Sequence, residues 1–144
     1  MKNTILFLTL LLSFLLIGCN KCDPSNDTSG IVKKDAIIRA INGKGGNNFV
    51  RQPSDYNLPI EVSFDGGVTY EAVDYTQYSA FSLPTTASCS SGYLRDVSIN
   101  QEESTVTYTV TITECDYCEG STSINNWVLT EKVNSSFTPI FNIN

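Results

Sequence analysis

Most of the chain consists of short β-prone segments separated by turn residues. From residue 31 onward, Val, Ile, Thr, Tyr and Phe dominate the segments, and Gly, Asn, Asp, Ser and Pro recur between them about every ten residues. No stretch shows a convincing helical period. We therefore expect an all-β fold, an antiparallel β-sandwich of about eight strands that is immunoglobulin-like in size.

The clearest predicted strand is the segment 105–113, which reads TVTYTVTIT. Because successive side chains of a strand point to opposite faces, its apolar residues form a core face and its threonines a solvent face. A return strand is predicted over 123–133, and a last strand over 137–143 contains Pro139, which belongs on a sheet edge. The expected core residues are Val106, Tyr108, Val110, Ile112, Trp127, Leu129 and Val133.

Three other segments are assigned with less regular patterns. Segment 31–41 is expected to be the first strand, with a short helix as the alternative. The segment 85–92 is rich in small residues and is predicted to be a loop, followed by a strand over 93–99. The Gly-rich segment 42–48 lacks the Gly-Lys-Ser/Thr ending of a phosphate-binding loop and is predicted to be a plain turn.

Segments 58–64 and 68–73 are predicted to form a hairpin, because the tripeptide DGG at 65–67 tolerates the positive φ of a tight turn. Residues 63–70, SFDGGVTY, resemble the Asp-box S-x-D-x-G-x-T-W, with Tyr70 in place of Trp. In sialidases and other β-propellers, the Ser and Asp of that box lock an outer turn away from the catalytic centre. The resemblance implies the same turn here, and a single copy implies neither a propeller nor sialidase activity.

The N-terminus has the pattern of an export signal. Lys2 precedes an apolar run at 5–17, which is shorter than the roughly 20 residues of a transmembrane helix and is therefore predicted to be cleaved. The run ends in LIGC at 16–19, which resembles the lipobox of bacterial lipoproteins. The resemblance implies cleavage after Gly18 and attachment to the lipid bilayer through an acylated Cys19.

Three segments follow from this interpretation. Residues 1–18 are the lipoprotein signal peptide, 19–30 the lipid anchor with a flexible polar tether, and 31–144 a single β-domain. Asn20 stands where inner-membrane lipoproteins of enteric bacteria carry Asp. The resemblance therefore implies the bacterial outer membrane, on either its cell-surface or its periplasmic face.

Charge and composition exclude several function classes. The formal net charge is −6, and the chain contains no histidine. An acidic surface repels phosphate backbones, which argues against nucleic acid as a partner. The lack of imidazole removes Ser-His-Asp, Cys-His and His-zinc catalysis. We expect no enzymatic activity, no cofactor and no metal site.

Four cysteines besides Cys19 are expected to form disulfides in the oxidising compartment that an export signal implies. Cys115 and Cys118 enclose two residues, and if these form a hairpin turn, the two cysteines lie directly opposite each other. The same register places Val106 opposite Trp127. This geometry favours a 115–118 disulfide, while three pairings stay open for the candidates Cys22, Cys89, Cys115 and Cys118.

An aromatic segment at 70–81 supplies the candidate binding residues. Exposed Tyr rings stack on sugars and form hydroxyl hydrogen bonds, although such rings also fill the cores of β-domains. Tyr75 and Tyr78 are the ligand-binding candidates, because the surrounding sequence, DYTQY, is otherwise polar.

These features favour a membrane-anchored lipoprotein that displays a non-enzymatic β-domain for binding a glycan or an envelope protein. One alternative is a structural or assembly lipoprotein of an envelope complex. The other is an enzyme, either a carboxylate-based glycan hydrolase or a dithiol oxidoreductase. Two carboxyl groups about 5–9.5 Å apart in a cleft would favour the hydrolase.

Overall fold

The protein has an all-β fold, as the sequence predicts. The computed structural model describes residues 24–41, 43, 45–115 and 119–144. These residues form ten strands in three sheets and one short 3₁₀ helix, η1 (Pro53–Asp55). The strands are β1 (Asn26–Gly30), β2 (Ile37–Ala40), β3 (Asn48–Val50), β4 (Ile60–Ser63), β5 (Glu71–Ala72), β6 (Tyr78–Ser88), β7 (Gly92–Asn100), β8 (Thr105–Thr113), β9 (Ser121–Glu131) and β10 (Thr138–Ile143).

The largest sheet is four-stranded, with the order β1-β7-β8-β10. Its middle strands, β7 and β8, pair antiparallel. The prediction of a purely antiparallel arrangement is wrong at both edges, because β1 runs parallel to β7 and β10 runs parallel to β8. Between each edge strand and the strand it pairs with, the chain passes through strands of the other sheets. Such a connection permits a parallel pair, whereas a short hairpin does not.

The first strand lies inside the predicted tether. Residues 19–30 are expected to be flexible, yet Asn26–Gly30 form β1 and pair with β7. The Ser29 hydroxyl also donates a hydrogen bond to Asp96 at 2.6 Å. The strand is polar because it lies at an exposed edge, so no apolar periodicity indicates it. The ordered sheet therefore begins before residue 31.

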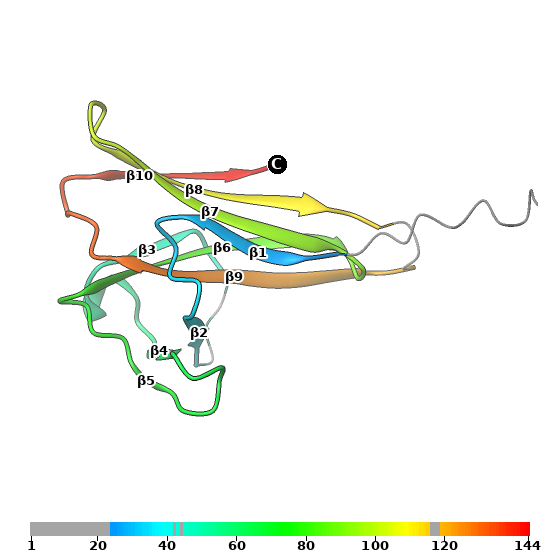
Figure 1. The fold of residues 1–144 in the computed structure, drawn as a ribbon, viewed down its shortest axis with the longest axis horizontal. Coiled ribbons are helices and arrows are strands. Elements are labelled where there is room, and N and C mark those ends of the chain that lie inside the picture. Colours follow the sequence, from blue (N-terminus) through cyan, green and yellow to red (C-terminus); the bar gives the residue numbers. More distant parts are fainter. Residues whose placement is uncertain (1–23, 42, 44, 116–118) are drawn as a thin grey trace, which may run out of the picture.

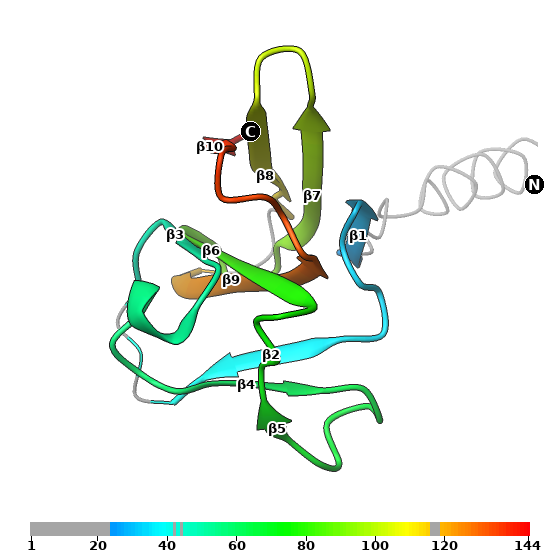
Figure 2. The ribbon, with the colours of Figure 1, turned by 90° about the vertical axis from the view of Figure 1, so that its left-hand side faces the viewer.

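The three sheets are stacked as layers (Figures 1 and 2), and the sheet β3-β6-β9, here called the central sheet, lies in the middle. One hydrophobic core separates it from the four-stranded sheet, and a second core separates it from the third sheet, β2-β4-β5. On β6, Phe81 belongs to the first core and the neighbouring Ala80 to the second. The third layer explains why the strand count exceeds the expected number of about eight.

The core positions expected from 105–113 and 123–133 are buried or partly buried. Ile112 packs against the first core and Trp127 against the second, and both are partly buried. The remaining five have between 0% and 1% of their surface exposed: Val106, Tyr108, Val110, Leu129 and Val133.

The partner of β9 differs from the prediction. β9 pairs along its whole length with β6, so Trp127 lies opposite Ser82 and not opposite Val106. β6 extends to Ser88, into the predicted loop 85–92. Because Ser, Thr and Pro dominate this part of β6, its pattern resembles a loop. Alternation specifies the face that each residue takes and leaves the neighbouring strand open.

The other strand predictions are confirmed in part, because the strand within 31–41 covers only four residues and is the second strand of the chain, and that within 68–73 covers only two. Segment 31–41 contains the strand β2 and no helix. Segments 58–64 and 68–73 contain β4 and β5, which pair antiparallel. Pro139 lies in β10, at an edge of the four-stranded sheet.

Most strands run along the long axis, which gives the molecule two different ends (Figure 1). We call the end that contains the first described residues and the connection from β6 to β7 the proximal end, and the opposite end the distal end. At the proximal end, the Tyr93 N–H donates to the Ser25 C=O at 3.0 Å. The distal end contains η1, the start of β6 and the end of β9 (Figure 1).

Candidate ligand-binding site

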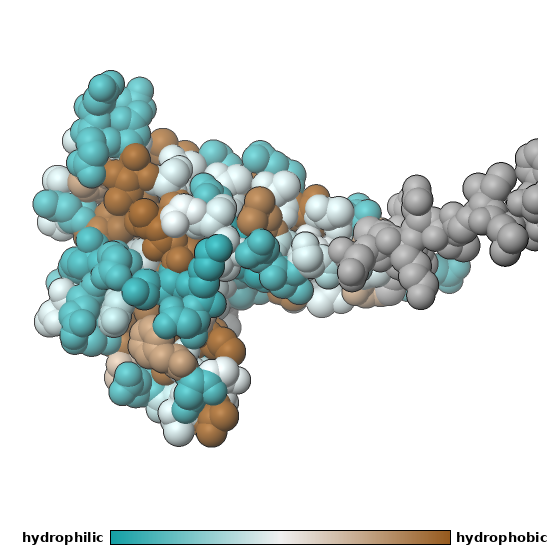
Figure 3. All heavy atoms as spheres, in the orientation of Figure 1, coloured by the Kyte–Doolittle hydropathy of each residue, from teal (hydrophilic) through white to brown (hydrophobic). Residues whose placement is uncertain are grey.

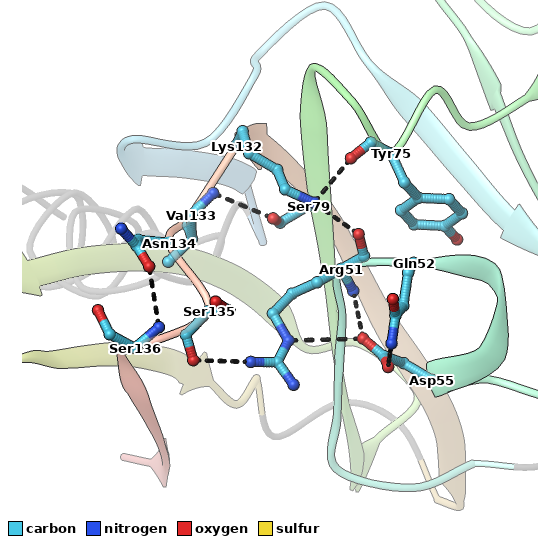
Figure 4. A network of polar contacts seen from close by, with 10 residues as sticks. All are labelled: Arg51, Gln52, Asp55, Tyr75, Ser79, Lys132, Val133, Asn134, Ser135 and Ser136. Carbon is cyan, nitrogen blue, oxygen red and sulfur yellow. Dashed lines mark hydrogen bonds and ion pairs between the residues drawn. The ribbon is translucent and has the colours of Figure 1, made fainter.

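A polar network at the distal end joins three segments that are distant in sequence (Figure 4). These are the chain from β3 into η1, the turn before β6, and the chain that leaves β9. Lys132 links all three, because its Nζ donates to the backbone C=O of Arg51 and, at 2.7 Å, to that of Tyr75. Arg51 Nη1 donates to the C=O of Ser135 at 3.0 Å. The two cations thus serve as cross-links between backbones.

Asp55 fixes the backbone around η1. Its carboxylate accepts hydrogen bonds from the Arg51 N–H at 2.8 Å and from Gln52 Nε2 at 3.0 Å, and Arg51 Nε lies 3.5 Å away. Burial by itself would raise the pKa of Asp55, but these donors and the Arg51 charge outweigh burial, and the pKa is lowered. Asp55 is therefore a carboxylate at neutral pH.

Asp74 closes the turn that presents Tyr75. Its carboxylate accepts hydrogen bonds from the Thr76 hydroxyl at 2.6 Å, from the Thr76 N–H at 2.9 Å and from Gln77 Nε2 at 2.8 Å. These hydrogen bonds, the Thr76 hydroxyl first, lower the pKa of Asp74. With Lys132 holding the carbonyl of Tyr75, the backbone of Tyr75 is fixed on both sides.

Two adjoining hollows meet at Tyr75. One has a volume of about 400 Å³, and the other, of about 460 Å³, extends to Arg51 and Lys132. They share Pro53, Val73 and Tyr75, and together we call them the Tyr75 groove. Its apolar arm is lined by Pro53, Tyr56, Asn57, Leu58, Pro59, Ile60, Glu61, Ala72, Val73 and Tyr75.

The Tyr75 groove combines aromatic surface with a few polar groups. Burial, together with the nearby charge of Asp55, raises the pKa of Tyr75 to about 12, so its hydroxyl stays protonated at neutral pH. The Tyr56 ring packs edge-on against Trp127, with ring centroids 5.4 Å apart. Asn57 and Glu61 add hydrogen-bonding side chains. Such a surface suits a ligand with an apolar face and hydroxyl groups at its rim.

The structure separates the two tyrosines that the sequence groups together. Both rings are partly buried and pack against the second core, but Tyr75 also lines the groove, whereas Tyr78 begins β6. The Tyr78 ring centroid lies 5.9 Å from that of Phe64. Tyr78 thus has the core-filling environment that is the alternative to binding.

The hairpin at 63–70 has the hydrogen bonds that the Asp-box resemblance implies. Ser63 Oγ donates to Asp65 at 2.6 Å and accepts from the Gly67 N–H at 2.8 Å. The Thr69 hydroxyl and N–H donate to Asp65 at 2.6 and 2.9 Å. These bonds, that of Ser63 first, hold the pKa of Asp65 well below its usual range. Both glycines of the turn have positive φ, 74° and 89°, which a side chain would strain.

Cys89 and Cys115 each take part in a disulfide bond. The loop that carries Cys89 contacts the segment around Cys115, because the Ser90 hydroxyl donates to the Cys115 C=O. The predicted 115–118 pair stays a prediction, although β8 and β9 do not form the hairpin that favours it. Outside the described residues lie Cys19, Cys22 and Cys118.

Arg51, Asp55 and Lys132 are not singled out by the sequence. Arg51 and Asp55 are four positions apart around a proline, which is a weak local signal for a capped turn. Lys132 is separated from both by most of the domain, so only the pairing of β9 with β6 brings it to the site.

Comparison with known proteins finds no family model, no curated protein and no solved structure that matches the chain. Among the described residues, no group of three or more His, Cys, Asp or Glu side chains could hold a metal ion. No helix in that part of the chain is long and apolar enough to cross a membrane.

Proposed function

We propose that the protein is a bacterial outer-membrane lipoprotein, anchored through an acylated Cys19, whose β-domain binds a ligand without catalysing a reaction. The ligand is a glycan that occupies the Tyr75 groove. For the fold, we propose that the four-stranded and central sheets form the sandwich expected from the strand spacing, with the third sheet added to it.

The observation that carries this proposal is the way the groove is built. Tyr56, Tyr75 and Leu58 offer apolar surface, and Glu61 and Asn57 offer hydrogen bonds at its rim. Aromatic rings of this kind stack against the C–H faces of sugars, while amide and carboxylate groups bind hydroxyls. Because the backbone at Tyr75 is already fixed by Lys132 and Asp74, little entropy is lost on binding.

The position of the groove suits display from a membrane. The described chain begins at the proximal end, beside Tyr93, whereas η1 and the turn before β6, which carry Pro53 and Tyr75 of the groove, lie at the distal end (Figure 1). An anchor a few residues before Pro24 would leave the distal end directed away from the bilayer. A ligand on the far side of the domain would then reach the groove freely.

The surface gives less support to assembly through a broad apolar contact. On the face shown in Figure 3, apolar side chains form one cluster over the upper layer, toward the distal end, and smaller groups among polar side chains elsewhere. Docking onto a large membrane complex would favour a continuous apolar patch of several hundred Å². A domain that displays a small binding site needs no such patch, so the mixed surface supports display more than docking.

A glycan-binding screen of the mature chain, with Cys19 and its lipid in detergent micelles, tests the proposal. We expect a defined set of glycans to bind and to be recovered unchanged after prolonged incubation. Intact-mass analysis of the same preparation should show a chain that begins at an acylated Cys19. Binding to no glycan, or release of shortened glycans, would contradict the proposal.

A further inference from the structure

β9 is an edge of the central sheet, and along most of its outer side no described strand pairs with it. The sheet order β3-β6-β9 gives this strand of 11 residues a single full-length neighbour, β6. On the outer side, the described residues form only one bridge to β9, between Val32 and Thr130. Next to that bridge, the Lys33 N–H donates to the Leu129 C=O at 2.8 Å. The described residues thus pair with one end of this edge and not with the rest of it.

The direction of the backbone groups follows from the same contact. The Leu129 C=O points away from β6, and the groups of alternate residues in a strand point to the same side. Trp127, Asn125 and Ser123 therefore direct their N–H and C=O groups outward. The residue opposite Asn125 is Pro84, which has no N–H to donate. A proline fits at a position of β6 that forms no backbone hydrogen bonds with β9. Pro84 therefore agrees with an Asn125 backbone that points away from β6.

A groove runs beside the open edge. It has a volume of about 270 Å³ and lies between the outer side of β9 and residues of the four-stranded and third sheets. β1 and β2 are on either side of β9 in Figures 1 and 2. Thr28, Ala36 and Ile38 line the opposite wall, and Asn125 and Trp127 line the β9 wall.

Two polar groups in this groove lack complete partners. Asn125 Oδ1 is the buried side-chain oxygen without a hydrogen-bond partner among the described residues. Arg95 is half-buried on the inner side of β7, and its Nε donates to Asn126 Oδ1 at 2.9 Å. Its guanidinium carbon lies 5.5 Å from the Tyr93 ring centroid, and within the described part of the chain no carboxylate forms an ion pair with it. A ligand with a carboxylate and a hydrogen-bond donor would satisfy both groups.

We propose that the open edge of β9 receives an extended peptide of a protein partner, which adds a strand along 123–127 and places an Asp or Glu side chain against Arg95. Main-chain hydrogen bonds to the outward groups of β9 supply the pairing, and the guanidinium supplies the selectivity for an acidic residue. The domain as a whole is acidic, so the attraction is local to this groove. This site is separate from the Tyr75 groove.

Selection of random linear peptides on the mature lipidated chain in detergent micelles tests the proposal. We expect the selected peptides to be β-prone and to share an Asp or Glu. Arg95→Gln should weaken their binding at least ten-fold, and Arg95→Lys, which keeps the charge, should weaken it less. The matched control Arg39→Gln, at a guanidinium on the third sheet that is paired with Glu61, should leave binding unchanged.

Methylation of the backbone nitrogens of the peptide provides a readout that a merely structural role of Arg95 would not change. If the peptide adds a strand, methylation at alternate residues should abolish binding and methylation at the intervening residues should not. Tyr75→Ala should leave peptide binding intact, and Arg95→Gln should leave glycan binding intact. The two proposals can therefore fail separately.

Three results would overturn the inference. One is failure to select any peptide. The second is selection of peptides whose affinity is the same for Arg95→Gln, or is insensitive to the position of methylation. The third is dimerisation of the free protein that is lost on Ser123→Pro, since a second copy would then be the natural occupant of the edge.

Discussion

At the scale of single residues, Asp65 shows how one side chain closes a hairpin. Its carboxylate accepts hydrogen bonds from Ser63 and Thr69, and these lower its pKa in the folded state. A group with a lowered folded pKa contributes stability above its unfolded pKa of about 3.9, and this contribution is lost as the pH falls below that value. The hairpin is therefore most stable at neutral pH and weakens in acid.

The pH dependence of the stability that Asp65 contributes gives a prediction for Asp65→Asn. We expect the variant to melt at a lower temperature than the parent protein at neutral pH, and the difference to shrink as the pH is lowered from 6 to 3. Thermal unfolding followed by circular dichroism measures it. Asp35→Asn, on an exposed turn, is the matched control. A difference that is constant across this pH range would show that the charge of Asp65 is not what stabilises the turn.

Inside the first core, Tyr108 contributes to stability through one hydrogen bond of its hydroxyl. It has no exposed surface, and its hydroxyl donates to the Asn126 C=O at 2.9 Å. Tyr108→Phe should lower the free energy of unfolding by about 1–2 kcal/mol, measured by urea denaturation. Tyr93→Phe removes a hydroxyl from the same core without a hydrogen bond among the described residues and should cost less. Equal losses would contradict the assignment.

At the scale of elements, the sequence predicts faces better than partners. The strict alternation at 105–113 identifies the buried side of β8 correctly, because the period of a strand depends only on its own residues. The pairing of β9 with β6 is not predictable in this way, since β6 is rich in Ser and Thr and contains Pro84. β1 is missed because a polar edge strand leaves no apolar pattern. Of the Tyr75 groove, only Tyr75 itself is indicated by the sequence.

Substitution of Lys132 tests whether the three segments that it links at the distal end stabilise one another. Lys132→Met keeps most of the side-chain length but removes the donor to the carbonyls of Arg51 and Tyr75. We expect a loss of about 1 kcal/mol in the free energy of unfolding and faster amide hydrogen exchange in 51–55 and 74–77. Lys34→Met, at an exposed residue, is the control. Unchanged exchange in both segments would refute the linking role of Lys132.

At the scale of the whole molecule, we propose different roles for the two ends. The first described residues, Pro24 and Ser25, lie at the proximal end against Gly92. Cys89, which takes part in a disulfide bond, precedes Gly92 in the connection from β6 to β7. The elements that carry Pro53 and Tyr75 of the Tyr75 groove lie at the distal end (Figure 1). The open edge of β9 runs between the two ends. We therefore propose that attachment, peptide contact and ligand binding use three separate regions of one small domain.

Of these proposals, the binding of a ligand in the Tyr75 groove is the one on which the proposed function depends. The most direct test is the affinity of the best glycan from the screen for the parent chain, for Tyr75→Ala and for Tyr70→Ala, by isothermal titration calorimetry. Tyr70 is the matched control, because its ring lies on the third sheet under Arg39, 3.7 Å from the guanidinium carbon. We predict at least about a ten-fold loss of affinity, or about 1.4 kcal/mol, for Tyr75→Ala and none for Tyr70→Ala. Equal affinities for all three chains would contradict the account.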